Sequence, residues 1–227
     1  MSSIAIIPAR GGSKRIPGKN KKLFLGKPII TYSIEAALQS SLFDEVMVST
    51  DDPEIAEIAK QLGASVPFLR SSETSNDLAT LAEVIQEVLA TYNGLNKKFD
   101  TVCCVLPTAP FVSSEMLRLA YTKLQDENLE VVFPVVAFSF PIQRALKIKD
   151  QLVSMLSPKY MNSRSQDLEE RYHDAGQFYI LNTNAFQKEQ KIYLQLAGAI
   201  IASPLKVQDI DTETDWKLAE MKYKLVL

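Results

Sequence analysis

Short apolar runs alternate with longer amphipathic stretches as far as Val136. The apolar runs have the length and the β-branched content of buried strands, whereas the amphipathic stretches have the 3.6-residue period of helices. We predict strands at Ile4–Ile7, Glu45–Ser49, Thr101–Leu106 and Val131–Val136, and helices at Ile29–Ser40, Pro53–Leu62, Leu78–Tyr92 and Ser113–Glu127. Because β-α-β units join parallel strands, this order predicts a three-layer α/β fold with helices on both faces of a mostly parallel sheet.

Capping side chains precede three of these helices. Asp52 and Pro53 suit the start of the second helix, since aspartate accepts backbone N–H groups and proline tolerates the first helical position. Ser113, Ser114 or both suit the start of the helix that ends at Glu127. Asn76 or Asp77 would cap the helix at Leu78–Tyr92 in the same way.

The alternation stops between about Ala137 and Gln177. Prolines, short alternating segments around Leu146–Met155 and a polar run through Asn162–Arg171 exclude a simple crossover helix. We interpret this segment as an inserted β-rich arm, after which Phe178–Leu181 resumes a strand and Asn184–Gln195 forms a helix. Protruding arms often reach a second subunit, so we expect a homodimer.

The composition fits one globular domain over residues 1–227. With 227 residues, 46% of them hydrophobic, the chain is long enough to bury a substantial core. The sequence lacks a signal peptide and a ~20-residue apolar span, so we expect a cytoplasmic protein without membrane contact. The net charge of −2 argues against nucleic-acid binding. Adjacent Cys103 and Cys104 would point to opposite faces of a strand, which predicts core thiols.

A basic, glycine-containing loop follows the first predicted strand, where ligands of α/β sheets gather. Gly11 and Gly12 would let the backbone turn at positive φ and direct N–H groups at phosphate oxygens. Arg10, Lys14 and Lys19 would surround the same anion with positive charge. We therefore predict a nucleoside triphosphate site, with a solvated basic turn as the alternative. Arg15, Lys21 and Lys22 are weaker candidates that would otherwise face solvent.

The spacing within this loop differs from two common nucleotide motifs. Lys14 follows Gly12 by two residues, so the G-x-x-x-x-G-K-[ST] motif is missing and an ATP-dependent kinase is disfavoured. The loop also lacks the G-x-G-x-x-G spacing of a dinucleotide site.

Asp209 and Asp211 are a second candidate for phosphate chemistry. In an extended segment, residues two apart project to the same side and can share a hard cation with phosphate oxygens. The alternative is a helix cap, because Thr-Glu-Thr-Asp-Trp follows directly. Both interpretations stay open on these residues alone. We expect Asp215 to be a helix-start acid and Trp216 to lie in the core.

Three motifs together resemble the acylneuraminate cytidylyltransferase family of CMP-sugar synthetases. They are Ile7-Pro8-Ala9-Arg10-Gly11-Gly12-Ser13-Lys14, Leu106-Pro107-Thr108-Ala109-Pro110-Phe111 and Asp209-Ile210-Asp211-Thr212-Glu213-Thr214-Asp215-Trp216. Members of this family transfer CMP from CTP to α-keto acid sugars and use a divalent cation. The resemblance spans nearly the whole chain. It implies a Rossmann-like nucleotidyltransferase sheet with a dimerising arm, and Mg²⁺ or another divalent cation at Asp209 and Asp211.

Within the family, Arg164–Leu168 and Tyr172–Tyr179 are most similar to the branch that acts on pseudaminic acid. The sialic acid branch commonly has glutamine where this chain has Leu106, and Asn-Gly-Ala where it has Ala175-Gly176-Gln177. Both changes would alter hydrogen bonds to the sugar. Sialic acid is the alternative substrate, and a non-catalytic nucleotide-sugar sensor is the alternative function.

The chemistry of the reaction assigns roles to the nucleotide-side residues. Arg10, Lys14 and Lys19 would neutralise the triphosphate as catalytic groups, with Gly11, Gly12 and Ser13 contacting it through backbone or hydroxyl groups. The main chain near Ala9 and Arg10 would read the base. The resemblance implies help from Asp77 and Thr80, which are also candidates for a helix cap, and contacts from Pro107 and Thr108.

Five residues are candidates for the sugar site. Arg164 offers a bidentate fork for the sugar carboxylate, with a surface arginine as the alternative. His173 is a sugar-binding candidate whose alternative is a hydrogen-bonded structural residue beside Asp174. Gln166 and Tyr179 complete the set, and Gln177 is the preferred specificity residue.

Overall fold

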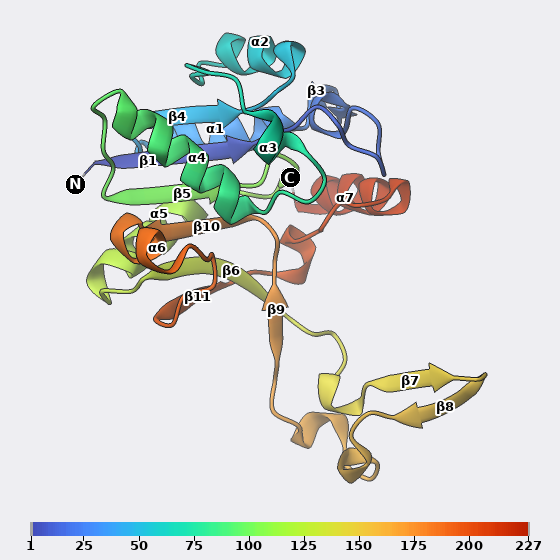
Figure 1. The fold of residues 1–227 in the computed structure, drawn as a ribbon. Coiled ribbons are helices and arrows are strands. Elements are labelled where there is room, and N and C mark those ends of the chain that lie inside the picture. The colour runs from blue at the N-terminus through green and yellow to red at the C-terminus, as the bar shows by residue number, and fades with distance from the viewer. Residues whose placement is uncertain (1, 227) are drawn as a thin grey trace.

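The computed structural model describes residues 2–226 and contains a seven-stranded sheet between two helical layers (Figure 1). Its strands are β1 (Ser3–Pro8), β4 (Glu45–Ser49), β5 (Thr101–Val105), β6 (Val131–Ala137), β9 (Tyr172–Asp174), β10 (Phe178–Asn182) and β11 (Ala197–Ile201). Six of them lie in the order β11-β6-β10-β5-β1-β4, and β9 pairs with β6. The three-layer α/β prediction is confirmed.

Five strands run in one direction, but β10 lies between β5 and β6 and is antiparallel to both. The path of the chain explains the reversal. The arm leaves the sheet at the end of β6 and returns as β9, which is antiparallel to β6. β10 continues in that direction, so it enters the sheet without the crossover that a parallel strand needs.

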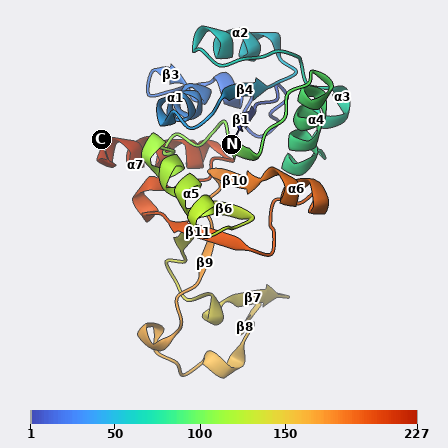
Figure 2. The same ribbon diagram turned by 90° about the vertical axis from the view of Figure 1, so that its left-hand side faces the viewer.

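Helices cover both faces of the sheet, as Figure 2 shows in a view turned by 90°. They are α1 (Ile30–Ser40), α2 (Pro53–Gln61), α3 (Ser72–Ser75), α4 (Leu81–Gly94), α5 (Ser114–Asp126), α6 (Thr183–Glu189) and α7 (Glu213–Val226). α1 and α5 cover one face, and α4 and α6 cover the other. The predicted caps Asp52 and Ser113 are confirmed, because each side chain accepts backbone N–H groups of its helix.

Successive strand residues divide between two buried clusters, one on each face. Cys103 packs in the cluster with α1 and α5, whereas Cys104 packs in the cluster with α4. Both thiols are free and buried, as predicted, and burial raises their pKa values. Two neighbours on a pleated strand therefore serve opposite layers of the core.

Two predicted helices have different bounds in the structure. α4 begins at Leu81 because Thr80, and not Asn76 or Asp77, is its N-cap in a reciprocal capping box with Glu83. The helix predicted at Asn184–Gln195 is shorter and ends at Glu189, because Gln190 adopts a left-handed conformation with φ 53°. Strand β11 and the small hairpin of β2 (Leu23–Phe24) and β3 (Lys27–Pro28) were not predicted.

The predicted arm extends away from the sheet (Figures 1 and 2). It contains an antiparallel hairpin of β7 (Leu146–Lys149) and β8 (Leu152–Met155). Three short 3-10 helices, Ile142–Arg144, Pro158–Tyr160 and Ser165–Asp167, make up much of the rest. Within residues 2–226, no helix is long and apolar enough to cross a membrane.

A third buried cluster joins the two ends of the chain. It combines Ile16 and Phe24 from the N-terminal loop and hairpin with Ile210 and Trp216 from the C-terminal segment. The Phe24 ring meets Trp216 and Tyr223 edge-on, at centroid distances of 5.7 and 5.6 Å. This packing confirms Trp216 as a core residue and holds α7 beside the loop that follows β1.

Thr80→Ala should destabilise the protein by about 1 kcal/mol, because it removes the N-cap of α4. Urea unfolding followed by circular dichroism would measure this loss. Leu78→Ala is the matched control, since Leu78 is 90% exposed and a surface truncation should change stability by less than about 0.5 kcal/mol. Equal losses in the two variants would contradict a helix start at Leu81.

Candidate functional site

A cavity of about 440 Å³ lies at the carboxyl ends of β1 and β5, the sheet edge at which the sequence predicts a ligand. Its walls come from the loop after β1, from the segment around α3 and the start of α4, and from the residues after β5. The lining residues include Pro8, Arg10, Ser13, Lys14, Arg15, Lys19, Asn20, Arg70, Asp77, Pro107 and Thr108. Four basic residues of one loop therefore border the same space.

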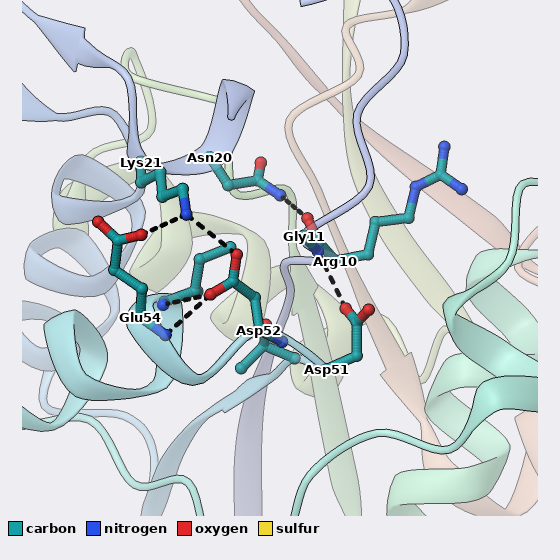
Figure 3. A network of polar contacts seen from close by, with 9 residues as sticks. Arg10, Gly11, Asn20, Lys21, Asp51, Asp52 and Glu54 are labelled. Carbon is teal, nitrogen blue, oxygen red and sulfur yellow. Dashed lines mark hydrogen bonds and ion pairs between the residues drawn. The ribbon is translucent and has the colours of Figure 1, made fainter. Parts of the chain in front are cut away.

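Two side chains hold the backbone of this loop in place (Figure 3). The Asn20 amide donates to the Arg10 carbonyl at 2.9 Å, and the Gly11 N–H donates to Asp51 Oδ1 at 2.9 Å. The Ala9 N–H donates to the Ser49 carbonyl, which prolongs the pairing of β1 with β4. The backbone N–H groups of Ala9 and Gly11 are thus already bound within the protein.

Gly11 and Gly12 do not adopt the positive φ that the sequence predicted for them. Gly11 and Gly12 are not among the glycines with positive φ, which are Gly18, Gly26, Gly63 and Gly176. A Cβ on Gly11 would lie 2.9 Å from the Cβ of Asp52, so glycine is needed for close approach to the start of α2. Ser13 lines the cavity, whereas Gly11 and Gly12 do not.

Two carboxylates pair with the four cations of the cavity. Arg10 Nη1 lies 2.7 Å from Asp77 Oδ1, and Lys14 forms a close ion pair with the same carboxylate. On the other side, Arg15 lies 2.7 Å from Asp211 Oδ2 and Lys19 lies 3.5 Å from Asp211 Oδ1. The basic loop therefore contacts the distant C-terminal segment through Asp211, although neither Asp209 nor Asp211 is among the residues that line the cavity.

The remaining basic residues of the loop do not simply face solvent. Lys21 pairs with Asp52 at 3.2 Å and with Glu54 (Figure 3), and these carboxylates raise its pKa. Lys22 pairs with Glu213 at 2.6 Å and lies over the Trp216 ring. Both lysines thus anchor the loop to α2 and α7, outside the cavity lining.

The helix-cap interpretation of Asp209 and Asp211 is wrong. Thr212 Oγ1 accepts the Asp215 N–H, and the Asp215 carboxylate accepts the Thr212 N–H at 2.8 Å. Asp215 is therefore the helix-start acid of α7, as predicted, and its bonds to Thr212 hold its pKa low. Asp209 and Asp211 precede this cap and are left for other partners.

The environment of the Asp209 carboxyl raises its pKa. Its residue is exposed at the surface, yet the surrounding protein displaces enough water from the carboxyl to raise its pKa. The neighbouring Asp211 raises it further, and Lys19 and Arg15 oppose the shift. Asp209 forms no ion pair of 4 Å or less within residues 2–226, whereas Asp211 is paired with Arg15 and Lys19. Carboxylate oxygens are the donors that a hard divalent cation prefers.

The protein supplies few donors to such a cation. Among residues 2–226, no group of three or more His, Cys, Asp or Glu side chains could hold a metal ion. Mg²⁺ usually binds one or two protein carboxylates together with waters and substrate phosphates, so the pair at Asp209 and Asp211 fits that ion.

Arg70 is a cavity residue that sequence reasoning missed. Its guanidinium is buried, donates to the Ser49 hydroxyl at 3.0 Å and to the Ser49 carbonyl at 2.6 Å, and lines the cavity. Desolvation lowers its pKa, although Asp51 opposes the shift. A single arginine after two apolar residues carries no motif, so only the structure could identify it. Asn20 also lines the cavity and was missed.

The other nucleotide-side candidates divide into two groups. Pro107 and Thr108 line the cavity, as does Asp77. Lys14 and then Arg10 lower the pKa of Asp77, so this carboxylate occupies the cations predicted to bind phosphate. Thr80 is not among the lining residues, and its hydroxyl is bound to Glu83 in the α4 cap.

The predicted sugar residues are not gathered in this cavity. Arg164 pairs with Asp167 on the arm at 2.8 Å, and Gln166 lies on the same turn. His173 is exposed on β9 against Phe138. Gln177 is buried and donates to the Lys206 carbonyl at 2.7 Å, whereas the Tyr179 hydroxyl donates to Asp174 Oδ2 at 2.8 Å.

A larger hollow of about 520 Å³ lies elsewhere, between α4 and α6. It includes Asp100, which precedes β5, and therefore opens at the opposite end of that strand from Thr108. None of the basic loop residues lines it. The smaller cavity is the candidate site because it alone of the two combines the motif residues with clustered charge.

An α/β sheet with a cationic cavity at the carboxyl ends of its strands is the architecture of a nucleotide-binding protein. A family model described as cytidylyltransferase matches residues 4–223. A pseudaminic acid cytidylyltransferase of Campylobacter jejuni subsp. jejuni is 42% identical over 226 residues, which cover 99% of this chain and 97% of that protein. This chain belongs to the cytidylyltransferase family.

Two further proteins extend the comparison. A CMP-N,N'-diacetyllegionaminic acid synthase of Legionella pneumophila is 34% identical, over 99% of this chain and 97% of that protein. The solved structure of a CMP:2-keto-3-deoxy-manno-octonic acid synthetase complexed with CTP superposes with a TM-score of 0.72 at 19% identity and covers all of both chains. The latter likeness shows a shared fold.

Asp77→Asn should strengthen the binding of inorganic triphosphate by about two- to fivefold, because Arg10 and Lys14 would no longer be paired with a carboxylate. Calorimetry without metal would measure the dissociation constant. Glu73→Gln, which removes an exposed acid of α3, is the control for net charge and should change binding less. Unchanged or weaker binding by Asp77→Asn would contradict a competition between this carboxylate and the ligand phosphates for Arg10 and Lys14.

Proposed function

We propose that this protein transfers CMP from CTP to the anomeric hydroxyl of pseudaminic acid, a nine-carbon α-keto acid sugar, and releases pyrophosphate. The observation that carries the proposal is the meeting of the basic loop with the carboxylate segment, where Lys19 and Arg15 pair with Asp211. That arrangement provides positive charge for a triphosphate and carboxylates for its counter-cation at one place. The 42% identity to a pseudaminic acid cytidylyltransferase, over 99% of this chain, supports the choice of sugar.

The reaction is an in-line displacement at the α-phosphorus of CTP. The oxygen of the sugar C2 hydroxyl forms the new O–P bond and its proton passes to solvent water, while the bond from the α-phosphorus to the bridging oxygen breaks and pyrophosphate leaves. Anionic sugar and triphosphate repel each other, and charge grows on the leaving group. Arg10, Lys14 and Lys19 would stabilise this charge from fixed positions, so catalysis rests on alignment and electrostatics without a covalent intermediate.

Asp209 and Asp211 would hold a divalent cation, most simply Mg²⁺. When bound, this ion would act as a Lewis acid and would partly neutralise the phosphate charge. Lys19 and Arg15 already pair with Asp211, so they would have to share or exchange that carboxylate. Arg70 and Asn20 would complete the nucleotide-binding wall, because both line the same cavity.

The decisive assay is pyrophosphate release from CTP and Mg²⁺ with pseudaminic, sialic and octulosonic acids compared side by side. We expect the highest kcat/KM with pseudaminic acid and a CMP-sugar as the product. A higher value with sialic acid would contradict the choice of sugar. Tight CTP binding without pyrophosphate release from any sugar would favour a nucleotide-sugar sensor.

Arg10→Ala tests the catalytic part of the same proposal. Loss of this phosphate clamp should lower kcat by about 100- to 1000-fold, by analogy with the loss of an oxyanion donor. Lys217→Ala, an exposed residue of α7, is the control and should leave kcat unchanged. Near wild-type turnover by Arg10→Ala would contradict its role.

The arm supports a homodimer as part of this proposal. Leu146 and Ile148 on β7 share one face of the hairpin with Val153 and Met155 on β8, and the first three are at least 60% exposed. Arg164, the candidate for the sugar carboxylate, lies on the same arm and outside the cavity lining of its own chain. A second copy seated against this apolar face would cover it and receive Arg164 at its own site.

Val153→Asp should therefore weaken the dimer, because it places charge on the apolar face. Light scattering after size-exclusion chromatography would give the mass over a range of concentrations. Ser154→Asp adds the same charge to the opposite face of the same strand and should leave the mass unchanged. A monomeric wild-type protein at micromolar concentration would refute the homodimer.

A further inference from the structure

The segment that carries Asp209 and Asp211 has no regular secondary structure of its own. It runs from the 3-10 turn Pro204–Lys206 to the start of α7 at Glu213, and is therefore positioned by its neighbours. Val207 and Ile210 are buried in two different clusters, on either side of Asp209. These apolar contacts hold the segment against the protein core. Hydrogen bonds to its backbone carbonyls hold it as well.

Gln177 provides the first of these contacts. Its side chain is only 1% exposed and its Nε2 donates to the Lys206 carbonyl at 2.7 Å. The Gln177 backbone carbonyl also accepts the Leu106 N–H at 2.8 Å, so Gln177 is itself held beside the carboxyl end of β5. The side-chain Oε1 is buried and has no hydrogen-bond partner among residues 2–226. Within residues 2–226, the Gln177 side-chain amide thus makes its hydrogen bond to the 206–211 segment.

Lys222 provides the second contact, from α7. Its Nζ donates to the Val207 carbonyl at 2.7 Å, and desolvation lowers its pKa. An ammonium that loses part of its hydration needs a strong acceptor, and here that acceptor is the carbonyl next to the one bound by Gln177. Two consecutive carbonyls are therefore bound by side chains from two separate parts of the chain.

The turn before Gln177 lies close to the same segment. Gly176 has φ +61°, and a Cβ on it would lie 3.9 Å from Cγ of Asp209. Its N–H donates to Asp174 Oδ1 at 2.6 Å, while the other oxygen of Asp174 accepts the hydroxyl groups of Tyr179 and Tyr193 at 2.8 and 2.5 Å. Asp174 thus ties this turn to the body of the protein beside Asp209.

We propose that Gln177 and Lys222 are positioning residues that bind the backbone of the 206–211 segment and so hold Asp209 and Asp211 in the geometry that binds a divalent cation. The inference rests on the proposed function for its cation. It gives Gln177 a role different from the sugar specificity predicted from the sequence. Residues that orient metal ligands without touching the ion commonly change metal affinity by 10- to 100-fold.

Gln177→Leu and Lys222→Met should each raise the dissociation constant for Mn²⁺, by about tenfold. The measurement is a titration of the CTP-bound full-length protein with Mn²⁺, followed by electron paramagnetic resonance, in the absence of sugar so that no turnover occurs. CTP affinity in EDTA should stay within twofold of wild type. Leucine removes both the amide donor and the orphaned acceptor, so the loss of stability should be modest.

Three further variants separate positioning from simple destabilisation. Lys222→Arg keeps a donor and should recover most of the Mn²⁺ affinity. Gln125→Leu and Lys224→Met, which alter an amide on α5 and an exposed lysine on α7, should leave Mn²⁺ binding unchanged. Thermal melts of all variants would reveal general destabilisation, which should not track Mn²⁺ affinity.

The outcomes distinguish this inference from the proposed function. Unchanged Mn²⁺ affinity in Gln177→Leu and Lys222→Met, with an altered preference among sugars in Gln177→Leu, would overturn the positioning role and restore Gln177 as a specificity residue. Failure of Asp209→Ala to weaken Mn²⁺ binding would remove the cation site on which the inference rests. Absence of CMP transfer by wild type would refute the proposed function, while the Mn²⁺ titrations would still decide the positioning role.

Discussion

The site depends on one packing contact between distant parts of the chain, the aromatic cluster of Phe24, Trp216 and Tyr223. Because this cluster fixes α7 against the hairpin that follows the basic loop, Asp211 lies within reach of Lys19 and Arg15. The hydrophobic effect that drives aromatic burial is non-directional and is hardly screened by salt, whereas an ion pair with an exposed arginine, such as Arg15–Asp211, is weak. The aromatic cluster therefore sets the position of α7, and the ion pairs of Asp211 form because of that position.

Electrostatic balance is the second constraint on the site. Four cations of one loop would repel each other strongly without counter-charges, and Asp77 and Asp211 supply these from two separate elements. An arriving triphosphate would replace internal carboxylates as the partner of Arg10 and Lys14. Binding of a triphosphate in this cavity would therefore require Arg10 and Lys14 to exchange the Asp77 carboxylate for phosphate oxygens.

Much of the fold was predictable because its signals are local. The apolar runs predicted β1, β4, β5 and β6, and the caps Asp52 and Ser113 identified the starts of α2 and α5. The start of α4 was missed because Asn76, Asp77 and Thr80 are all good capping residues, and only the backbone conformation selects Thr80. The direction of β10 was not predicted, because it follows from the path of the arm.

The sequence by itself determined the class of the fold, the basic loop and the paired carboxylates, because periodicity, caps and charge spacing are properties of neighbouring residues. Only the tertiary structure decided that Arg70 lines the cavity, that Gln177 binds the Lys206 carbonyl and that Asp77 pairs with Arg10. Those contacts join residues from different elements, and their partners are set by how the sheet, α7 and the arm pack together.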